Sequence, residues 1–582
     1  MSRILIIFSS LLFCSLQSLA QPNQVFLSSN GTQSASVKEV QDFYNFWLSK
    51  KSHLRKGLSV ALNAQDNLVT YEIGASNQQP DSTYVTLLIN NAIHAGEPDG
   101  VDATMLLVNE IMTGKFPIPK HVRLIILPFY NMNGLQNRNS TTRANQNGPE
   151  IYGFRANGQY LDLNRDMMKA DAIESNFMQE LLVSQKVDVL VDNHVSNGAD
   201  YQHIITLLTS QKDKYEPTAR DFIHQQMERS LYTQMKQRKY DLCPYVNHFS
   251  ETPENGWQEF YESPRFVSGF ASMFNIYAFV VETHMLKPYK QRVEATYAFL
   301  QEMINYCENN YKSINISREK ALQEQLQTTT IKLNFQCDTS YHEMIRFNGY
   351  TPGYKPSAIS GLPRLYYDRT KPFSKSIPFY NHFVPKDSVR VPDAYIIPKE
   401  WLMKFDDKYL LKQFINSTSY FAKDTILTLS YYTIDNYATT KSPYEGHYLH
   451  YNTSVTLRTE KVQVHVGDLI IRLQADEKFD EVALLKKCLV QLLEPVAEDS
   501  YFNWNFFDPI LQQKEGYSDY VFEDLAAEEL KQNPSLAKAL EEAKLKDANL
   551  AQNGGAQLNW VYQHSIYREP GYKRYPILRW NY

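Results

Sequence analysis

The sequence has no basic stripe, no closely spaced pair of cysteines and, after its first residues, no long apolar run. Its 59 Lys and Arg residues are balanced by 64 Asp and Glu residues, which gives a formal net charge of −5 at pH 7. A nucleic-acid-binding protein would concentrate positive charge in one domain, so we expect no nucleic-acid partner. A membrane helix needs about 20 consecutive apolar residues, so we expect no membrane span in the mature chain.

Cysteine is scarce, with 5 residues in 582. The four that follow the N-terminal segment are far apart and form no CxxC pair: Cys243, Cys307, Cys337 and Cys488. This spacing excludes a cysteine-ligated zinc site and a disulfide scaffold. One or two bridges can form in an oxidising compartment, but the sequence does not pair them. Buried free thiols are the favoured interpretation.

The N-terminus has the pattern of a secretory signal peptide. Arg3 precedes an apolar run at residues 4–13, and the small residues Ser18 and Ala20 suit a cleavage site. The run is too short, and the segment after it too polar, for a membrane anchor. We therefore expect residues 1–20 to be a signal peptide and the mature protein to be secreted or periplasmic.

A chain of 582 residues exceeds what one hydrophobic core normally serves, so at least two domains are expected. Residues 37–312 alternate between short apolar runs and segments with helical spacing. The predicted strands are residues 85–90, 122–130, 187–193 and 277–281. Continuous apolar strands between helices predict an α/β fold, with a mostly parallel or mixed sheet covered by helices on both faces.

The composition and the apolar pattern of the chain change after the first domain. A predicted helix at residues 289–311 closes the first domain, and the polar residues 313–330 are interpreted as a connection. Residues 331–582 are rich in Tyr and Pro and carry short alternating runs, such as 455–458 and 462–466. Alternation with a period of two is typical of strands. We expect a C-terminal β-rich or α+β domain, whose role the sequence does not indicate.

One predicted strand leads directly into a pair of potential metal ligands, His94 and Glu97, in HxxE spacing. Imidazole and carboxylate groups are both good zinc ligands. The spacing alone is weak, because the chain has 14 His and 64 acidic residues. His248 and Glu251 form a second such pair, in a polar stretch. The strand end and the intervening Gly96 favour the first pair.

Two further polar residues follow predicted strands. His194 comes after residues 187–193, and Glu282 comes after residues 277–281. In open α/β sheets, ligands bind beyond the carboxyl ends of the strands. An unpaired carboxylate such as Glu282, buried there, would be costly without a functional partner. We therefore expect Glu282 and the three potential ligands to meet at one edge of the sheet.

Four segments occur in a fixed order: His94-Ala-Gly-Glu97, Asp162-Leu-Asn-Arg165, His194 within Asp-Asn-His-Val-Ser, and Glu282 within Val-Val-Glu-Thr-His. In this order they resemble the zinc carboxypeptidase family of metallopeptidases, over roughly residues 40–310. The run Asn145-Gln-Asn-Gly-Pro149 resembles the bacterial secreted branch of that family. The resemblance implies a zinc carboxypeptidase-like fold for the first domain.

The resemblance also implies a metal centre with one Zn2+ ion. His94, Glu97 and His194 would be its ligands, which leaves a fourth position for a water whose pKa zinc lowers to roughly 7. Glu282 would act as general base and acid, taking the water's proton and returning it to the leaving amine. Asp162 resembles the carboxylate that orients a ligating histidine.

A substrate site is implied next to that centre. Asn164 and Arg165 would grip a terminal carboxylate, because a guanidinium fork fits a carboxylate bidentately. Arg143 would contact the substrate and stabilise the developing oxyanion. Its place just ahead of an Asn-Gln-Asn-Gly run selects it over Arg138 and Arg155, which are interpreted as solvated loop arginines.

Three other residues stay outside the predicted site. The family's active-site tyrosine has no clear counterpart, and Tyr261 is one candidate among many. His203 and His284 are near the predicted strand ends in sequence. Such histidines are more often packing residues than ligands, so neither joins the ligand set.

The favoured function is a secreted zinc metallocarboxypeptidase, a protease that hydrolyses the last peptide bond of a peptide or peptide-like substrate with a free C-terminal carboxylate. A zinc-dependent deacylase or amidase of N-acyl amino acids is the first alternative. The metal loop of those enzymes usually has Gly directly after the His, where this chain has Ala95. A non-catalytic peptide-binding module on the same scaffold is the second alternative, and the presence of every ligand and the base disfavours it.

Overall fold

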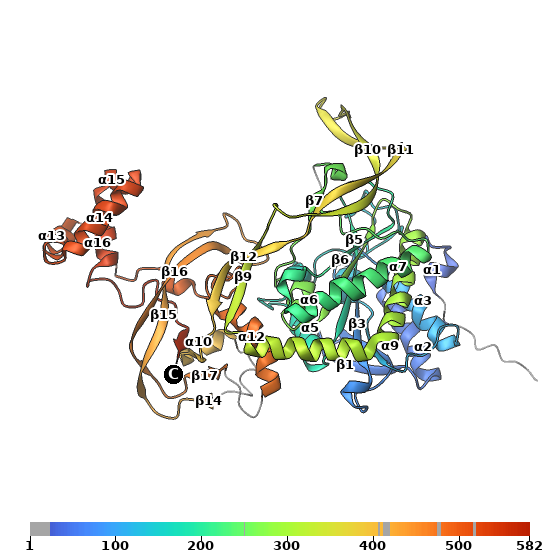
Figure 1. Ribbon diagram of the computed structural model, residues 1–582, viewed down its shortest axis with the longest axis horizontal. Helices are drawn as coiled ribbons and strands as arrows, with labels where there is room; N and C mark the ends of the chain where they lie inside the picture. The colour runs from blue at the N-terminus through green and yellow to red at the C-terminus, as the bar shows by residue number, and fades with distance from the viewer. Residues whose placement is uncertain are drawn as a thin grey trace, which may run out of the picture.

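A computed structural model of the chain describes residues 22, 24–248, 251–405, 408–410, 419–473, 479–515 and 520–581. The molecule is elongated, with an α/β body at one end and a β-rich body with a helical extension at the other (Figure 1). The predicted signal peptide, residues 1–20, lies outside the described residues, so export stays a prediction. In the described part of the chain, no helix is long and apolar enough to cross a membrane.

Seven strands form the central sheet of the α/β body. They are β1 (Arg55–Ala61), β2 (Asn67–Gly74), β3 (Val85–Asn91), β4 (Val122–Leu127), β5 (Val189–Ser196), β6 (Ile205–Thr209) and β8 (Tyr277–His284). Their order across the sheet is β1-β2-β4-β3-β5-β8-β6. The inner strands β4, β3, β5 and β8 are parallel, whereas β1, β2 and β6 pair antiparallel. The expected α/β fold with a mixed sheet is confirmed.

Helices cover both faces of this sheet. On one face, Thr283 of β8 donates a hydrogen bond to Asp99 of α3 (Asp99–Thr113), and Tyr277 bonds to Ser317 of α9 (Tyr289–Gln327). On the other face, α8 (Val267–Ser272) packs against β5 and β8. The remaining helices of the body are α1 (Val25–Ser28), α2 (Val37–Lys50), α4 (Met132–Gln136), α5 (Ile173–Ser184), α6 (Pro217–Phe222) and α7 (Arg229–Gln237).

Local sequence explains several element ends. Ser36 and Glu39 form a capping box that begins α2. Gly114 has a φ of 80° and ends α3, because glycine adopts the left-handed conformation without steric cost. The strands β5 and β8 run past their apolar residues to Ser196 and His284. His194 and Glu282 therefore lie inside the strands rather than after them, because polar residues there still pair in the parallel ladder.

The connection expected at residues 313–330 is wrong, because α9 continues to Gln327. Its residues Ile314, Ser317, Ala321 and Gln325 are buried at intervals of three and four. This spacing places them on one helical face against the rest of the protein. A polar composition therefore concealed an amphipathic helix.

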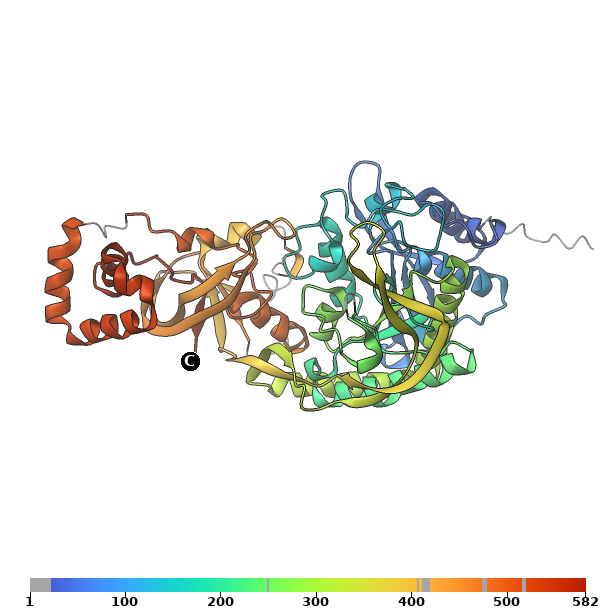
Figure 2. The ribbon, with the colours of Figure 1, turned by 90° about the horizontal axis from the view of Figure 1, so that it is seen from above.

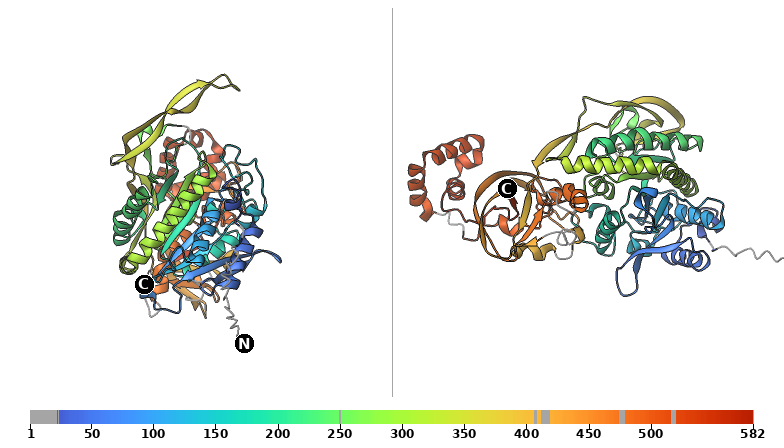
Figure 3. Two further views of the ribbon diagram at one scale, coloured as in Figure 1. Left: turned by 90° about the vertical axis from the view of Figure 1, so that its right-hand side faces the viewer. Right: turned by 60° about the horizontal axis from the view of Figure 1, so that its bottom comes forward.

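A long hairpin packs on the α/β body. It consists of β10 (Glu343–Pro356) and β11 (Pro363–Tyr380), and β11 pairs with β7 (Trp257–Gln258) of the α/β body. The far end of the hairpin projects from the molecule (Figure 3). Next to it, β9 (Thr330–Cys337) pairs with β12 (Phe383–Arg390). The domain limits 37–312 and 331–582 stay a prediction.

The C-terminal body is built on a six-stranded sheet with the order β14-β17-β13-β18-β15-β16. Its strands are β13 (Ala394–Ile397), β14 (Ser419–Tyr420), β15 (Thr425–Thr439), β16 (His450–Val464), β17 (Leu469–Arg472) and β18 (Leu578–Trp580). Its helices are α10 (Lys399–Leu402), α12 (Phe479–Leu493), α13 (Glu523–Gln532), α14 (Pro534–Lys546), α15 (Ala548–Gln552) and α16 (Gly554–His564). The expected β-rich character is confirmed, and the four cysteines among the described residues are free thiols.

Candidate metal centre

The turn between β3 and α3 carries two of the predicted ligands. The backbone N of Glu97 donates a hydrogen bond of 2.9 Å to the carbonyl of His94, which turns both side chains toward the same side. Gly96 lies between them, and a Cβ there would come within 2.7 Å of Arg143 Cδ. Glycine is needed at this position because the arginine side chain crosses the turn so closely.

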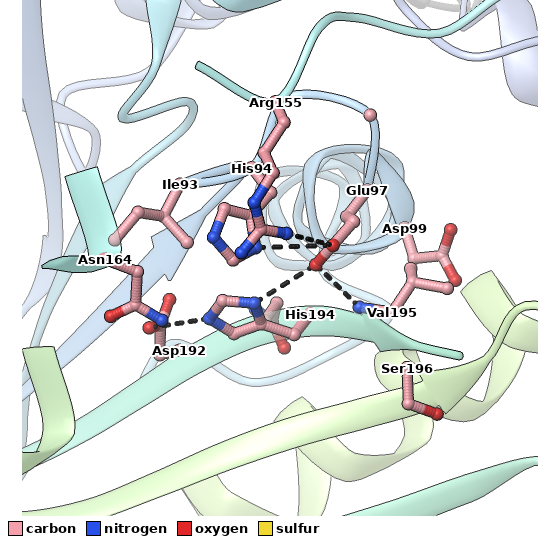
Figure 4. A network of polar contacts seen from close by, with 12 residues as sticks. Ile93, His94, Glu97, Asp99, Arg155, Asn164, Asp192, His194, Val195 and Ser196 are labelled. Atoms are coloured by element: carbon pink, nitrogen blue, oxygen red, sulfur yellow. Dashed lines mark hydrogen bonds and ion pairs between the residues drawn. The ribbon is translucent and has the colours of Figure 1, made fainter. Parts of the chain in front are cut away.

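His94, Glu97 and His194 come together as predicted (Figure 4). All three are buried, and one ligand atom of each lies within 4.8 Å of the others. Glu97 Oε1 is 3.3 Å from His94 Nδ1, and Glu97 Oε2 is 3.1 Å from His194 Nδ1. His94 Nδ1 is buried without a hydrogen-bond partner in the described part of the chain. Two imidazole nitrogens and a carboxylate therefore converge in a way that suits a metal ion.

The Nε2 atom of each imidazole contacts a carboxylate. His94 Nε2 lies 3.0 Å from Asp162 Oδ1, and His194 Nε2 lies 2.9 Å from Asp192 Oδ2. These contacts orient both rings so that Nδ1 faces Glu97. Asp162 was expected in this role, but Asp192 was missed. Its signal in the sequence is the Asp-x-His spacing, because residues two apart on a strand share a face.

The centre has an excess of negative groups. Its carboxylates are Glu97, Asp162, Asp192 and Glu282, and its guanidinium groups are Arg143 and Arg155. Burial alone would lower the pKa of His194, but the carboxylates around it outweigh burial and raise that pKa well above its usual range. Burial would raise the pKa of Glu97, yet His94, Arg143 and His194 hold it well below its usual range. The site therefore favours bound positive charge.

Glu282 is positioned by the sheet itself. It occupies the position on β8 that pairs with His194 on β5. The residue is partly exposed, but its Oε2 is buried without a hydrogen-bond partner in the described part of the chain. Loss of hydration, together with the charges of Glu97 and Asp192, raises the pKa of Glu282 to about 8, although His194 and Arg143 act in the opposite direction. Such a carboxylate can both accept and release a proton near neutral pH.

Arg143 and Arg155 both reach the centre. Arg143 donates to Glu97 Oε1 at 2.8 Å and to the carbonyl of Val195 at 3.0 Å. Arg155 donates two hydrogen bonds, of 3.0 and 2.8 Å, to Asp162 Oδ2. Arg155 is an exposed loop arginine, as interpreted from the sequence, but its guanidinium also forms an ion pair with Asp162. Arg138 instead donates to backbone carbonyls of the N-terminal segment, such as that of Ala35.

Asn164 and Arg165 lie on a short turn at the rim of the centre. The backbone N of Asn164 donates to Asp162 Oδ1 at 2.9 Å, and its side-chain oxygen accepts from Val267 N at 3.0 Å. The Arg165 guanidinium lies 4.2 Å from the centre of the Phe266 ring. Arg165 Nη1 also donates a hydrogen bond of 2.8 Å to the carbonyl of Asn164.

The residues left outside the predicted site lie elsewhere. Tyr261 packs on Phe383, with ring centres 5.4 Å apart, and does not reach the metal centre. His203 and His284 hydrogen-bond to backbone carbonyls and act as packing residues. His248 does the same, and the pair it forms with Glu251 belongs to no metal-binding group in the described part of the chain.

No protein-family model matches the chain, and no curated protein matches it. Among solved structures, it is similar to a metallo-carboxypeptidase from Pseudomonas aeruginosa in complex with (2-guanidinoethylmercapto)succinic acid, with 12% identity and a TM-score of 0.36, covering 47% of this chain and 69% of that one. It is also similar to carboxypeptidase A from Helicoverpa armigera, with 14% identity and a TM-score of 0.36, covering 50% of this chain and 75% of that one. A third similar structure is a metallo-carboxypeptidase from Burkholderia cenocepacia, with 12% identity and a TM-score of 0.34, covering 47% of this chain and 70% of that one.

Proposed function

We propose that the chain is an exported zinc-dependent metallocarboxypeptidase, which hydrolyses the C-terminal peptide bond of its substrate. One observation carries the proposal. Three buried groups of the kinds that bind zinc converge within 4.8 Å. Beside one of them, at the paired strand position, lies a carboxylate with one oxygen that has no hydrogen-bond partner among the described residues. A purely structural cluster would satisfy that oxygen with a hydrogen bond.

Zinc fits this donor set, because two imidazoles and one carboxylate make a three-ligand catalytic site of a kind that zinc occupies. His94, Glu97 and His194 would hold the ion. When bound, zinc lowers the pKa of water and polarises the carbonyl that is attacked. The contacts from Asp162 and Asp192 keep both imidazoles oriented for this task and raise their basicity.

Glu282 supplies the acid and base chemistry. It accepts the proton of the attacking water at its unpartnered oxygen and then delivers a proton to the leaving amine. Arg143 stabilises the negative charge that develops on the carbonyl oxygen. Its ion pair with Glu97 holds the guanidinium at the centre.

Asn164 and Arg165 bind the substrate's terminal carboxylate. Their side chains lie at the rim, and the planar guanidinium of Arg165 can offer two parallel hydrogen bonds to a carboxylate. The backbone of Asn164 is tied to Asp162, so the carboxylate anchor and the metal centre are parts of one connected unit. This arrangement sets the reaction one residue from the end of the peptide.

A substrate panel tests the proposal. The purified mature chain, loaded with zinc, is incubated with peptides that carry a free C-terminus, with the same peptides as C-terminal amides, and with N-acyl amino acids. We expect release of single C-terminal residues from the first group alone. Preferential cleavage of N-acyl amino acids would instead identify a deacylase, and binding of peptides without cleavage would identify a peptide-binding module.

A further inference from the structure

The C-terminal body makes a direct contact with the metal centre. Residues 440–449 join β15 to β16 and reach the α/β body, where the two bodies face each other (Figure 2). Glu445 Oε2 accepts a hydrogen bond of 2.7 Å from the backbone N of Asp162, although the two residues are 283 positions apart. Asp162 is the residue whose carboxylate holds His94. Glu445 of the C-terminal body therefore contacts Asp162, which in turn contacts the predicted metal ligand His94.

The backbone at Glu445 is unusual. Tyr444 and His447 close a two-residue turn with mutual backbone hydrogen bonds of 2.7 and 3.1 Å. The two central residues, Glu445 and Gly446, have φ values of 48° and 84°. A turn with both φ angles positive favours Asn or Asp followed by Gly, and glutamate is disfavoured in the left-handed conformation. The longer side chain of glutamate, however, reaches across to Asp162.

Other contacts besides that of Glu445 hold the turn and join the two bodies. His447 Nε2 lies 2.6 Å from Asp171 Oδ2 of the α/β body, and the Tyr444 ring stacks on Trp504 within the C-terminal body, with centres 6.1 Å apart. Arg265 forms a 2.7 Å ion pair with Asp499. The turn is held in place by these contacts, so the disfavoured glutamate is not needed to join the two bodies. Strained residues that the packing does not require are candidates for a functional role.

We infer that Glu445 is a positioning residue of the metal centre, supplied by the C-terminal body. It fixes the backbone at Asp162, and Asp162 in turn fixes the ring of His94. Metal affinity then depends on a contact between the two bodies, which gives the C-terminal body a role in the site. The inference rests on the metal site of the proposed function, but it concerns binding of the ion rather than hydrolysis.

The test measures the Zn2+ affinity of the full-length chain by competition with a chromophoric chelator. Glu445→Ala and Glu445→Gly remove the acceptor, and we expect the Kd for Zn2+ to rise about tenfold, at the lower end of what loss of a supporting contact costs. Glu445→Gln retains an acceptor oxygen, and its Kd should stay within about twofold of the wild type. Ser442→Ala, at an exposed position of the same loop, is the matched control and should not change the Kd.

Thermal stability separates positioning from a merely structural role. Glycine relieves the positive φ at position 445, so Glu445→Gly should melt at the wild-type temperature or above it while binding Zn2+ more weakly. A structural role would lower the melting temperature of that variant. Wild-type Zn2+ affinity in Glu445→Gly, or no recovery of affinity in Glu445→Gln, would overturn the inference. A wild-type chain that binds Zn2+ but cleaves no peptide would overturn the proposed function alone.

Discussion

His194 of β5 and Glu282 of β8 occupy directly paired positions on neighbouring parallel strands. Side chains at paired positions point to the same face of a sheet. The predicted ligand and the predicted base are therefore held side by side by backbone hydrogen bonds, without any contribution from a flexible loop. This pairing fixes the positions of the two residues relative to each other.

Replacement of Glu282 by Gln should remove the base and keep the metal. We expect kcat for peptide hydrolysis to fall by about 10²–10⁴-fold, because an amide cannot accept the proton. Zinc content should be unchanged, since Glu282 is not one of the three converging ligands. Kinetic assays and metal analysis of the same preparation measure both. Glu251→Gln, at the other HxxE pair, is the control, and full activity in Glu282→Gln would refute the assigned mechanism.

The two HxxE pairs should differ in metal binding. His94→Ala removes a ligand from the converging group, so the purified variant should lose most of its zinc. His248→Ala removes a histidine whose ring contacts the carbonyl of Gly256 and the Trp257 ring, and its zinc content should equal that of the wild type. Metal analysis after dialysis measures the zinc content of both variants. Equal zinc in both variants would place the ion elsewhere.

Asp192 should support metal binding although it is not a ligand. Asp192→Asn weakens the contact that orients His194, and we expect zinc affinity to fall by about 10–100-fold. Chelator competition measures the loss. Asp221→Asn, on an exposed residue of α6, serves as the control. An unchanged affinity in Asp192→Asn would show that the strand alone orients the imidazole.

Arg165 should govern recognition of the substrate carboxylate. Arg165→Lys replaces a bidentate fork by a point charge, and we expect KM for peptide acids to rise about tenfold with a smaller change in kcat. Steady-state kinetics on one peptide with increasing concentration measures both constants. Arg220→Lys, which is partly exposed on α6, should leave them unchanged. A fall in kcat without a change in KM would assign Arg165 to the chemical step instead.

Asp102 should make folding stability depend on pH. Burial on α3 raises the pKa of this carboxyl to about 7, despite the hydrogen bond that it accepts from Tyr289. An unfolded Asp has a pKa of about 3.9, so between about pH 4 and pH 7 the folded state binds more protons than the unfolded state. Stability therefore falls as pH rises through this window, by about 1.4 kcal/mol per pH unit at most.

Melting temperatures of the wild type and of Asp102→Asn, measured from pH 4.5 to pH 7.5, check this prediction. The variant has no carboxyl at this position, so its stability relative to the wild type should increase across the window and level off above pH 7. Parallel pH profiles for the two proteins would mean that Asp102 ionises normally.

Much of the α/β body could be predicted from the chain alone. Apolar runs of strand length predicted β3, β4, β5 and β8, because strands buried on both faces need apolar side chains throughout. The polar residues His94, His194 and Glu282 stood out because they interrupt or follow such runs. Parallel neighbouring strands bring those positions to one edge of the sheet, so the pattern also predicted that they meet.

Contacts between distant segments could not be predicted in this way. The ion pair of Arg155 with Asp162 is not apparent from its position on an exposed loop. The polar stretch after residue 312 looked like a linker until burial of Ala321 and its neighbours showed a helical face. Each of these depends on what lies opposite a side chain in space.

The sequence by itself determined the chemical identity of the centre and the sheet that carries it, since ligand types and apolar periodicity are local properties of the chain. The tertiary structure alone decided how the centre is supported. Arg155 and Glu445 contact partners that are chosen by packing, and packing joins segments as far apart as Asp162 and Glu445. Local pattern cannot encode such pairs, because the free energy that forms them comes from the burial of the whole interface.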